Sequence, residues 1–92
     1  MIKNFRCKHT QAIFEGRYSK KFQSIKIVAE HKLTMLDNAV TIEFLRSPPG
    51  NQLEALIGDR AGQHSVRINK QWRVCFIWKD GCPNDVEIVD YH

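Results

Sequence analysis

Residues 72–78 read WRVCFIW, and this run of aromatic and β-branched side chains decides the fold of the chain. A nearly continuous apolar run of this length is typical of a central strand. Residues 79–84 (KDGCPN) follow as a turn, and residues 86–89 (VEIV) form a last strand. Upstream, residues 64–68 alternate between polar and apolar side chains, which also indicates a strand. The second half of the chain therefore predicts antiparallel strands linked by short turns.

The clearest helix precedes these strands. Its buried face is formed by apolar residues at helical spacing, namely Phe22, Ile25, Ala29, Leu33, Leu36 and Val40. Ser19 is the expected N-cap, and Lys26 and Glu30 are expected to pair on the solvated side. A weaker helical turn covers residues 9–14 and ends near Gly16. The first half of the chain is therefore predicted to be helical.

These elements together predict an α+β domain, with N-terminal helices packed on a mainly antiparallel sheet of four to five strands. Residues 48–51 (PPGN) separate the two halves, because proline and glycine end any helix. The apolar helix stripe should cover one sheet face, and Arg67 and Arg73 or their neighbours should lie on the other. Since one face of an antiparallel sheet can remain solvated, a polar surface is left free for a ligand.

The composition fits a single domain over residues 1–92 and excludes several classes of protein. The chain is 42% hydrophobic and 26% charged, and no apolar run approaches the ~20 residues of a membrane-spanning helix. The N-terminus lacks the apolar core of a secretory signal, so we expect a cytoplasmic protein. The three cysteines and four histidines are scattered, which argues against a disulfide framework or a zinc site. The net charge of +4 permits a nucleic-acid partner without requiring one.

The sequence carries no metal motif, no Gly-rich phosphate loop and no nucleophile elbow. Any catalysis must therefore rest on acid–base side chains and arginines. Cleavage of RNA needs no more, because the 2′-hydroxyl of the substrate is the nucleophile. The protein supplies a base for the 2′-OH proton, cations for the charge at phosphorus and an acid for the departing 5′-oxygen. DNA lacks the 2′-OH, so such a site selects RNA.

The terminal residues Asp90, Tyr91 and His92 are the first candidates for this chemistry. Asp and His accept protons near neutral pH, and Tyr and protonated His donate them. The alternative is a frayed tail, which is the usual state of terminal residues. The strand over residues 86–89 counts against that alternative, because it ties the tail to the sheet.

Arg67 and Arg73 are the next candidates, because two arginines on adjacent strands can converge on one phosphate. The alternative is that both are surface charges whose stems pack over apolar neighbours. Arg60 lies in a turn and can serve either the structure or a substrate. Trp72 and Trp78 are expected in the core, with base stacking as the alternative.

Six segments of the chain carry a resemblance to a known family. They are LRSPPGN (45–51), LEAL (53–56), GDRAGQHS (58–65), RIN (67–69), QWRVCF (71–76) and VEIVDYH (86–92). In this order and spacing they resemble the HigB toxins of bacterial toxin–antitoxin modules, within the RelE-like superfamily. Each segment is short, and the specificity lies in their combination and in the terminal placement of the last one.

The resemblance implies a compact fold like that of microbial ribonucleases and a ribosome-dependent endoribonuclease activity. HigB toxins cut mRNA in the ribosomal A site without a metal or cofactor, leaving a 2′,3′-cyclic phosphate. The resemblance also implies a HigA-type helix-turn-helix antitoxin as partner, which packs away from the active site of the toxin. Operator DNA would then be contacted only through the antitoxin, in a complex that represses its own operon.

Residue by residue, the resemblance assigns roles to the candidates. Asp90, Tyr91 and His92 match the catalytic C-terminal end of the family, with His92 as general acid or base. Arg73 matches the arginine after the family's tryptophan and would stabilise the transition-state charge. Arg67 matches a superfamily arginine with a similar role.

The chain departs from some relatives at two positions. Glu54 stands where they carry a histidine, and Ile57 lies near the place of a lysine. Either Glu54 replaces that histidine as the base, or the acid–base chemistry rests on the tail. Arg60 and Lys70 are expected to bind RNA. The alternative to an enzyme is a degenerate module that only binds an antitoxin and its operator, and the two departures keep that alternative open.

Overall fold

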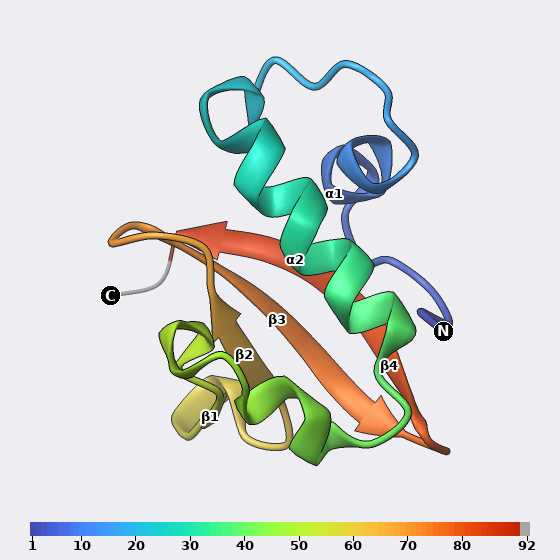
Figure 1. Cartoon of the computed structure of the whole chain (residues 1–92), viewed down its shortest axis with the longest axis vertical. Coiled ribbons are helices and arrows are strands. Elements are labelled where there is room, and N and C mark those ends of the chain that lie inside the picture. The colour runs from blue at the N-terminus through green and yellow to red at the C-terminus, as the bar shows by residue number, and fades with distance from the viewer. Residues whose placement is uncertain (91–92) are drawn as a thin grey trace.

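The structure is a computed structural model that describes residues 1–90 (Figure 1). Tyr91 and His92, two of the predicted catalytic residues, lie outside the described residues. Within residues 1–90, two α-helices precede four strands. These elements are α1 (Lys8–Phe14), α2 (Lys26–Asn38), β1 (Glu54–Ala55), β2 (His64–Arg67), β3 (Trp72–Lys79) and β4 (Cys82–Asp90). The order is the α+β layout expected from the sequence.

The four strands form one antiparallel sheet in the order β1-β2-β3-β4. β3 lies inside the sheet, as the apolar run of residues 72–78 predicted. The connection to β4 is shorter than expected, because Asp80 and Gly81 alone link the strands, with φ of 55° and 76°. A two-residue turn with positive φ matches the twist of the flanking strands. β4 therefore begins at Cys82, inside the segment that the sequence predicted to be a turn.

The outer edge of β4 is covered by the N-terminal segment. Phe5 and Val86 form an isolated parallel bridge. Backbone hydrogen bonds run from Lys3 N to Pro83 O (2.8 Å) and from Arg6 N to Val86 O (3.0 Å). Pro83 is tolerated because β4 is the last strand of the sheet. These contacts pair part of an otherwise free edge, and they fix Arg6 beside β4.

The start of α2 differs from the prediction. A 3₁₀ turn over Gln23–Ile25 precedes the helix, and Ile25 occupies the N-cap position without a side-chain hydrogen bond. Ser19, the expected cap, is buried, and its Oγ has no hydrogen-bond partner in the described part of the chain. That prediction was wrong because the 3₁₀ turn separates Ser19 from the helix. The expected ion pair is present, with Lys26 Nζ 3.6 Å from Glu30 Oε2.

α2 covers one face of the sheet and closes the core (Figure 1). The predicted stripe is buried at all but its last position, over Phe22, Ile25, Ala29, Leu33 and Leu36. Val40 is 79% exposed, because α2 ends at Asn38 and Ala39 takes the last buried place. Val74 and Phe76 of β3 are fully buried in the same cluster. Each such side chain contributes about 1.5–3 kcal/mol relative to remaining exposed.

Trp72 and Trp78 lie near the two ends of β3 and are partly buried against this core. The ring of Trp72 meets that of Phe22 edge-on, with the ring centroids 5.3 Å apart. The expected core position of both tryptophans is therefore confirmed, and Trp72 marks the face of the sheet that α2 covers.

A buried asparagine holds the segment between α2 and β1. Asn51 ends a 3₁₀ turn over Pro49–Asn51 and is fully buried. Its Nδ2 donates to Leu45 O (3.1 Å), and its Oδ1 accepts from Lys32 Nζ of α2 (2.6 Å). Gln52 follows in a left-handed conformation, with φ of 45°. These contacts determine where the chain enters β1.

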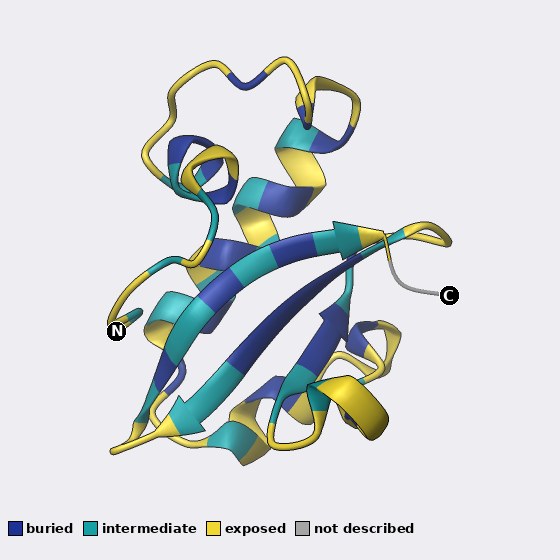
Figure 2. Ribbon diagram, turned by 180° about the vertical axis from the view of Figure 1, so that it is seen from behind, coloured by how far each residue is buried: buried dark blue, intermediate teal, exposed yellow. Residues whose placement is uncertain are grey.

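The opposite face of the sheet is not covered by α1 or α2, as the view from behind shows (Figure 2). We call it the open face. No helix within residues 1–90 is both long enough and apolar enough to cross a membrane.

Candidate functional site

Strand register defines which side chains belong to the open face. Residues directly opposite each other in an antiparallel ladder point to the same face of the sheet. One row across the strands comprises Glu54, Ser65, Cys75 and Glu87, and the next row comprises Arg67, Arg73 and Val89. Arg67 and Arg73 therefore share the face opposite α2, as the alternation of the sequence predicted.

Arg73 is held in a fixed orientation by acceptors on the neighbouring segments. The residue is only 7% exposed. Its Nε donates to Ser65 Oγ (2.7 Å), and its Nη2 donates to Gln52 O and, at 3.4 Å, to Ser65 O. Its Nη1 makes no hydrogen bond to the described residues. This nitrogen is the donor that remains for a ligand, and its prior ordering lowers the entropic cost of binding.

Arg67 lies directly opposite Arg73 and has no hydrogen bond or ion pair among the described residues. Like charges placed directly across a ladder destabilise a sheet. A bound anion would remove that repulsion, and guanidinium groups match the geometry of phosphate oxygens. The Arg67–Arg73 pair is therefore suited to binding a phosphodiester.

Glu54 supplies a carboxylate beside this pair. Its Oε1 lies 4.0 Å from Arg73 Nη2, and its side chain is 52% exposed. An ion pair at that distance and exposure is weak, so the carboxylate remains accessible to a ligand. A proton acceptor and a fixed positive charge are thus adjacent, and they are two of the three groups that RNA cleavage requires.

Arg60 reaches the open face from a 3₁₀ turn over Gly58–Arg60. Its Nη1 donates to Gln63 Oε1 (3.0 Å) and to Glu87 Oε2 (3.4 Å). The same oxygen of Glu87 lies 3.7 Å from Arg6 Nη1. Arg60 is therefore connected to β4 through a carboxylate that it shares with the N-terminal segment.

Cys75 is fully buried in the same row as Glu87. Burial raises the pKa of its thiol to about 11, and the charges of Arg60, Glu87 and Arg73 act on it more weakly. The thiol therefore stays protonated at neutral pH and is unsuited to act as a nucleophile or a metal ligand. The expectation that Cys75 is a small core residue is confirmed.

Asp90 ends β4 and lies directly opposite Trp72 of β3. It pairs with Trp72 in the ladder and so begins on the face that α2 covers. Its Oδ2 accepts a hydrogen bond from Gln71 Nε2 (3.1 Å). The register thus places Glu54, Arg67 and Arg73 on one face of the sheet, whereas Asp90 shares the face of Trp72.

Lys70, predicted to bind RNA, lies in the exposed turn between β2 and β3. It precedes Gln71, whose backbone N–H donates to Asn69 Oδ1 (2.8 Å). Tyr91 and His92 lie outside the described residues. The exposed turn that carries Lys70 lies at the end of the sheet where β4 also ends.

Three residues that hold the site were not singled out in the sequence. Ser65 and Glu87 stand out only once the strands are paired, because their partners lie 8 and 27 positions away. Gln52 contributes a backbone carbonyl that is oriented by its left-handed conformation. No glycine or asparagine at that position signals the conformation.

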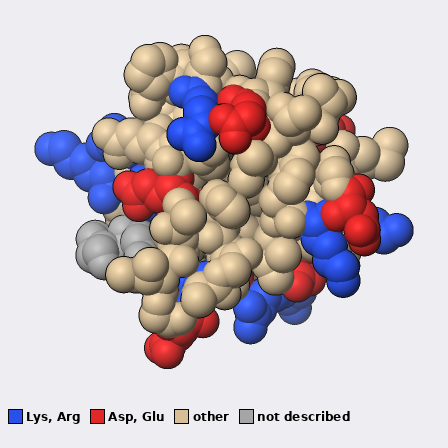
Figure 3. Space-filling model, turned by 90° about the horizontal axis from the view of Figure 1, so that it is seen from below, with Lys and Arg blue, Asp and Glu red and all other residues tan. Residues whose placement is uncertain are grey.

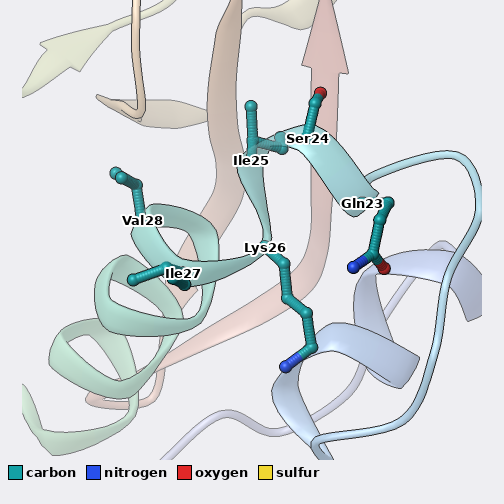
Figure 4. Close-up of a pocket in the computed structure, with 6 residues that line it drawn as sticks. All are labelled: Gln23, Ser24, Ile25, Lys26, Ile27 and Val28. Atoms are coloured by element: carbon teal, nitrogen blue, oxygen red, sulfur yellow. The ribbon is translucent and has the colours of Figure 1, made fainter.

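A separate hollow of about 310 Å³ lies at the start of α2 (Figure 4). It is lined by Gln23, Ser24, Ile25, Lys26, Ile27 and Val28. None of the candidate residues lines it, and its charged side chain, Lys26, is paired with Glu30. No group of three or more His, Cys, Asp or Glu side chains within residues 1–90 is placed to hold a metal ion.

Charges of both signs are interspersed on the face seen from below, around an uncharged centre (Figure 3). Several exposed arginines are neutralised by ion pairs, such as Arg17 with Glu15 (2.7 Å) and Arg46 with Glu43. A polyanion would therefore be recognised by individually placed arginines more than by a broad basic patch on this face.

Comparison with known proteins places the chain in a family. The model of the RelE-like toxin of type II toxin–antitoxin system HigB matches residues 3–92. The chain is 47% identical over 58 residues to Toxin HigB-1 of Vibrio cholerae serotype O1, covering 63% of this chain and 61% of that protein. It is 39% identical over 62 residues to an uncharacterized protein of Haemophilus influenzae, covering 67% and 59%. The matched stretches thus span about three fifths of each relative.

The fold is also similar to that of a solved structure. A crystal structure of a YafQ mutant from E. coli matches with a TM-score of 0.64 and 13% identity, covering 98% of this chain and 91% of that chain. At this identity the likeness concerns the fold alone, and it agrees with the predicted RelE-like α+β architecture.

Proposed function

The chain belongs to the RelE-like HigB toxins of type II toxin–antitoxin systems, and from that premise we propose that it is a ribosome-dependent endoribonuclease. It cleaves translated mRNA in the ribosomal A site and thereby inhibits translation and growth. The observation that carries the proposal is the placement of Arg73, Arg67 and Glu54 on one face of the sheet. This set supplies positive charge and a proton acceptor beside a surface that α1 and α2 leave uncovered.

The scissile phosphate binds between Arg67 and Arg73 in this proposal. The 2′-oxygen of the RNA attacks phosphorus and forms the P–O2′ bond, while the bond to the 5′-oxygen breaks. Arg73 Nη1 and the guanidinium of Arg67 stabilise the charge that develops on the non-bridging oxygens. The products are a 2′,3′-cyclic phosphate and a 5′-hydroxyl, and the reaction consumes no metal or cofactor.

Two assignments of the base are compatible with the residues. Glu54 is accessible and adjacent to Arg73, so its carboxylate can accept the proton of the 2′-hydroxyl. Alternatively, the tail of Asp90, Tyr91 and His92 carries the acid–base steps. In the first assignment, His92 or Tyr91 protonates the departing 5′-oxygen. The two assignments differ in whether substitution of Glu54 abolishes cleavage.

The partners follow from the family and from this chemistry. We propose a HigA-type helix-turn-helix antitoxin that holds the toxin inactive, with operator DNA contacted only through that antitoxin. The 30S A site of the ribosome positions the mRNA, and Arg60 and Lys70 contact its backbone. A cytoplasmic location is part of the proposal, because the substrate is translated mRNA.

A second candidate function is a non-catalytic module that only binds an antitoxin. Most donors of Arg73 are used by Ser65 and Gln52 within the protein. This arrangement would equally serve a structural arginine, and Glu54 and Ile57 stand where some relatives carry titratable or cationic groups.

Mapping of new mRNA 5′-ends against reading frame separates these functions. The wild type, His92→Ala and Glu54→Gln are each induced briefly in cells. We expect the wild type to produce cuts within translated codons and His92→Ala to produce none. Loss of the cuts in Glu54→Gln would assign the base to Glu54, and their persistence would assign it to the tail. Folded wild type that causes neither cuts nor growth arrest would contradict the enzyme and leave the binding module.

A further inference from the structure

The carboxylate of Glu87 occupies the open face but has no part in the proposed cleavage chemistry. Its side chain is only 17% exposed. Its Oε2 lies between two guanidinium groups, 3.4 Å from Arg60 Nη1 and 3.7 Å from Arg6 Nη1. A carboxylate that is largely removed from water and shared by two arginines forms stronger ion pairs than an exposed one.

The turn that carries Arg60 is exposed, and few of its side chains are held by contacts with the sheet. None of the residues of Gly58–Arg60 is buried. Gly58 precedes Asp59 with φ of 69°, and Gly62 follows with φ of 94°. Side-chain contacts from Arg60 to the described residues go to Gln63 and Glu87, and Gln63 belongs to the same loop. Glu87 is therefore the side-chain contact that links Arg60 to β4, in addition to the backbone bond from Leu56 N to Gln63 O (2.8 Å) that closes the loop.

We propose that Glu87 is a positioning residue that holds Arg60 over the open face, where Arg60 binds the RNA backbone beside Arg73. The proposal rests on the proposed function. Register places Glu87 next to Cys75, and Cys75 next to Ser65, which binds Arg73. The acceptors of the two guanidinium groups, Glu87 for Arg60 and Ser65 for Arg73, thus lie in one row of the sheet.

The effect of Arg60 and Arg73 on one thiol supports this arrangement. The charges of both arginines and of Glu87 influence the pKa of Cys75, which lies on β3 directly opposite Glu87 of β4. Two fixed cations at a set spacing favour one placement of a phosphodiester chain over others, which is how positioned arginines contribute to rate.

Removal of Glu87 is expected to change cleavage in opposite directions for two possible roles: positioning of Arg60, or an effect of its charge alone. Without the carboxylate, the positive charge of the protein rises by one, which favours binding of any polyanion. If Glu87 acts only through charge, its loss therefore preserves or increases cleavage. If it positions Arg60, its loss lowers the cleavage rate at saturating toxin, although binding to RNA is not weakened.

The test is single-turnover cleavage of mRNA on programmed ribosomes by Glu87→Ala, Arg60→Ala, the double variant and Glu87→Gln. We expect Glu87→Ala to lower the rate about tenfold and the double variant to cleave no more slowly than Arg60→Ala. Glu87→Gln should retain most of the rate, because its amide oxygen still accepts a hydrogen bond from Arg60. Arg6→Ala is the matched control, since it removes the other partner of Glu87, and it should cleave like the wild type.

Three outcomes would overturn the proposal. Glu87→Ala of unchanged melting temperature could cleave at the wild-type rate. The losses of Arg60→Ala and Glu87→Ala could multiply in the double variant, which would show that Glu87 does not act through Arg60. Glu87→Gln, the variant that is used if Glu87→Ala unfolds, could lose as much of the cleavage rate as Arg60→Ala. A wild type that cleaves no mRNA on ribosomes would instead contradict the proposed function itself.

Discussion

The covered face of the sheet and its open face are held together by different physical effects. On the covered face, Leu33 of α2 and Val74 and Phe76 of β3 are fully buried in one apolar cluster. On the open face, the buried groups include Arg73, which is stabilised by directed hydrogen bonds to Ser65 and Gln52. Apolar contact depends on area and tolerates small shifts, whereas a hydrogen bond depends on distance and angle.

The difference separates stability from function. An apolar cluster contributes free energy in proportion to the surface that it removes from water. The open-face arginines contribute little by that route, and in the proposed function they bind a ligand. We therefore expect substitutions in the apolar cluster to change the free energy of unfolding, and substitutions of the open-face arginines to change cleavage.

The largest effect on stability is expected from Leu33→Ala. The side chain is fully buried on the covered face, so its truncation should lower the free energy of unfolding by about 2–5 kcal/mol. Urea denaturation of the purified variant measures the change. Ile27→Ala on the same helix is the control, because Ile27 is 83% exposed. Equal losses for the two variants would contradict the placement of the core.

A pH-dependent loss is expected from Cys75. Burial raises the pKa of its thiol from 9.0 to about 11, so the unfolded chain releases this proton at lower pH than the folded chain does. The stabilisation is complete below pH 9 and is lost as the pH rises toward 11, by up to about 2.7 kcal/mol. Unfolding of the wild type and Cys75→Ala between pH 8 and 11 isolates this contribution. Parallel pH profiles for the two proteins would contradict it.

Asn51→Ala is expected to have an intermediate effect on stability and a further effect on cleavage. The substitution leaves Leu45 O and Lys32 Nζ without their present partner, at a cost of about 1–3 kcal/mol. It also loosens Gln52, whose carbonyl orients Arg73. Cleavage per folded molecule should therefore fall, whereas exposed Asn38→Ala should leave it unchanged. Full cleavage by folded Asn51→Ala would show that Arg73 does not depend on this loop.

The smallest change in stability is expected from Arg67→Ala. Because Arg67 has no partner among the described residues and faces another arginine, the free energy of unfolding should change by less than about 0.5 kcal/mol. Binding of single-stranded RNA should become less dependent on salt, with the slope of log K against log salt concentration reduced by about 0.7. Fluorescence anisotropy at several salt concentrations measures the slope. An unchanged slope would mean that Arg67 does not contact phosphate.

The residues of the covered face could be predicted from the sequence, because their apolar side chains recur at regular spacing. Helical spacing identified Ala29, Leu33 and Leu36, and the apolar run of residues 72–78 identified the inner strand. The errors lie at element ends. Ser19 was wrongly predicted as the N-cap because a 3₁₀ turn precedes α2, and Val40 is exposed because α2 ends early. Neither feature changes the spacing of the apolar residues along the helix.

The open face could be predicted only in part. Alternation placed Arg67 and Arg73 together, and Glu54 was noticed through the family resemblance. The bonds that orient Arg73 and Arg60 join residues 8 to 27 positions apart, so they require the strand register. That register depends on which residues form the turns, and the turn between β3 and β4 proved shorter than its sequence indicated. The roles of Asp90, Tyr91 and His92 stay predictions.

The most direct test of this account is single-turnover cleavage of mRNA on programmed ribosomes by Arg73→Ala and Lys20→Ala. Each variant removes one positive charge, from the open face and from the exposed segment before α2 respectively. Melting temperatures verify that both variants are folded. If Arg73→Ala is not folded, Arg73→Lys replaces it, because lysine keeps the charge without the guanidinium fork. We expect loss of Arg73 to slow cleavage by about 10²–10³-fold and Lys20→Ala to cleave like the wild type. A folded Arg73 variant that cleaves at the rate of Lys20→Ala would contradict the assignment of the open face as the site of cleavage.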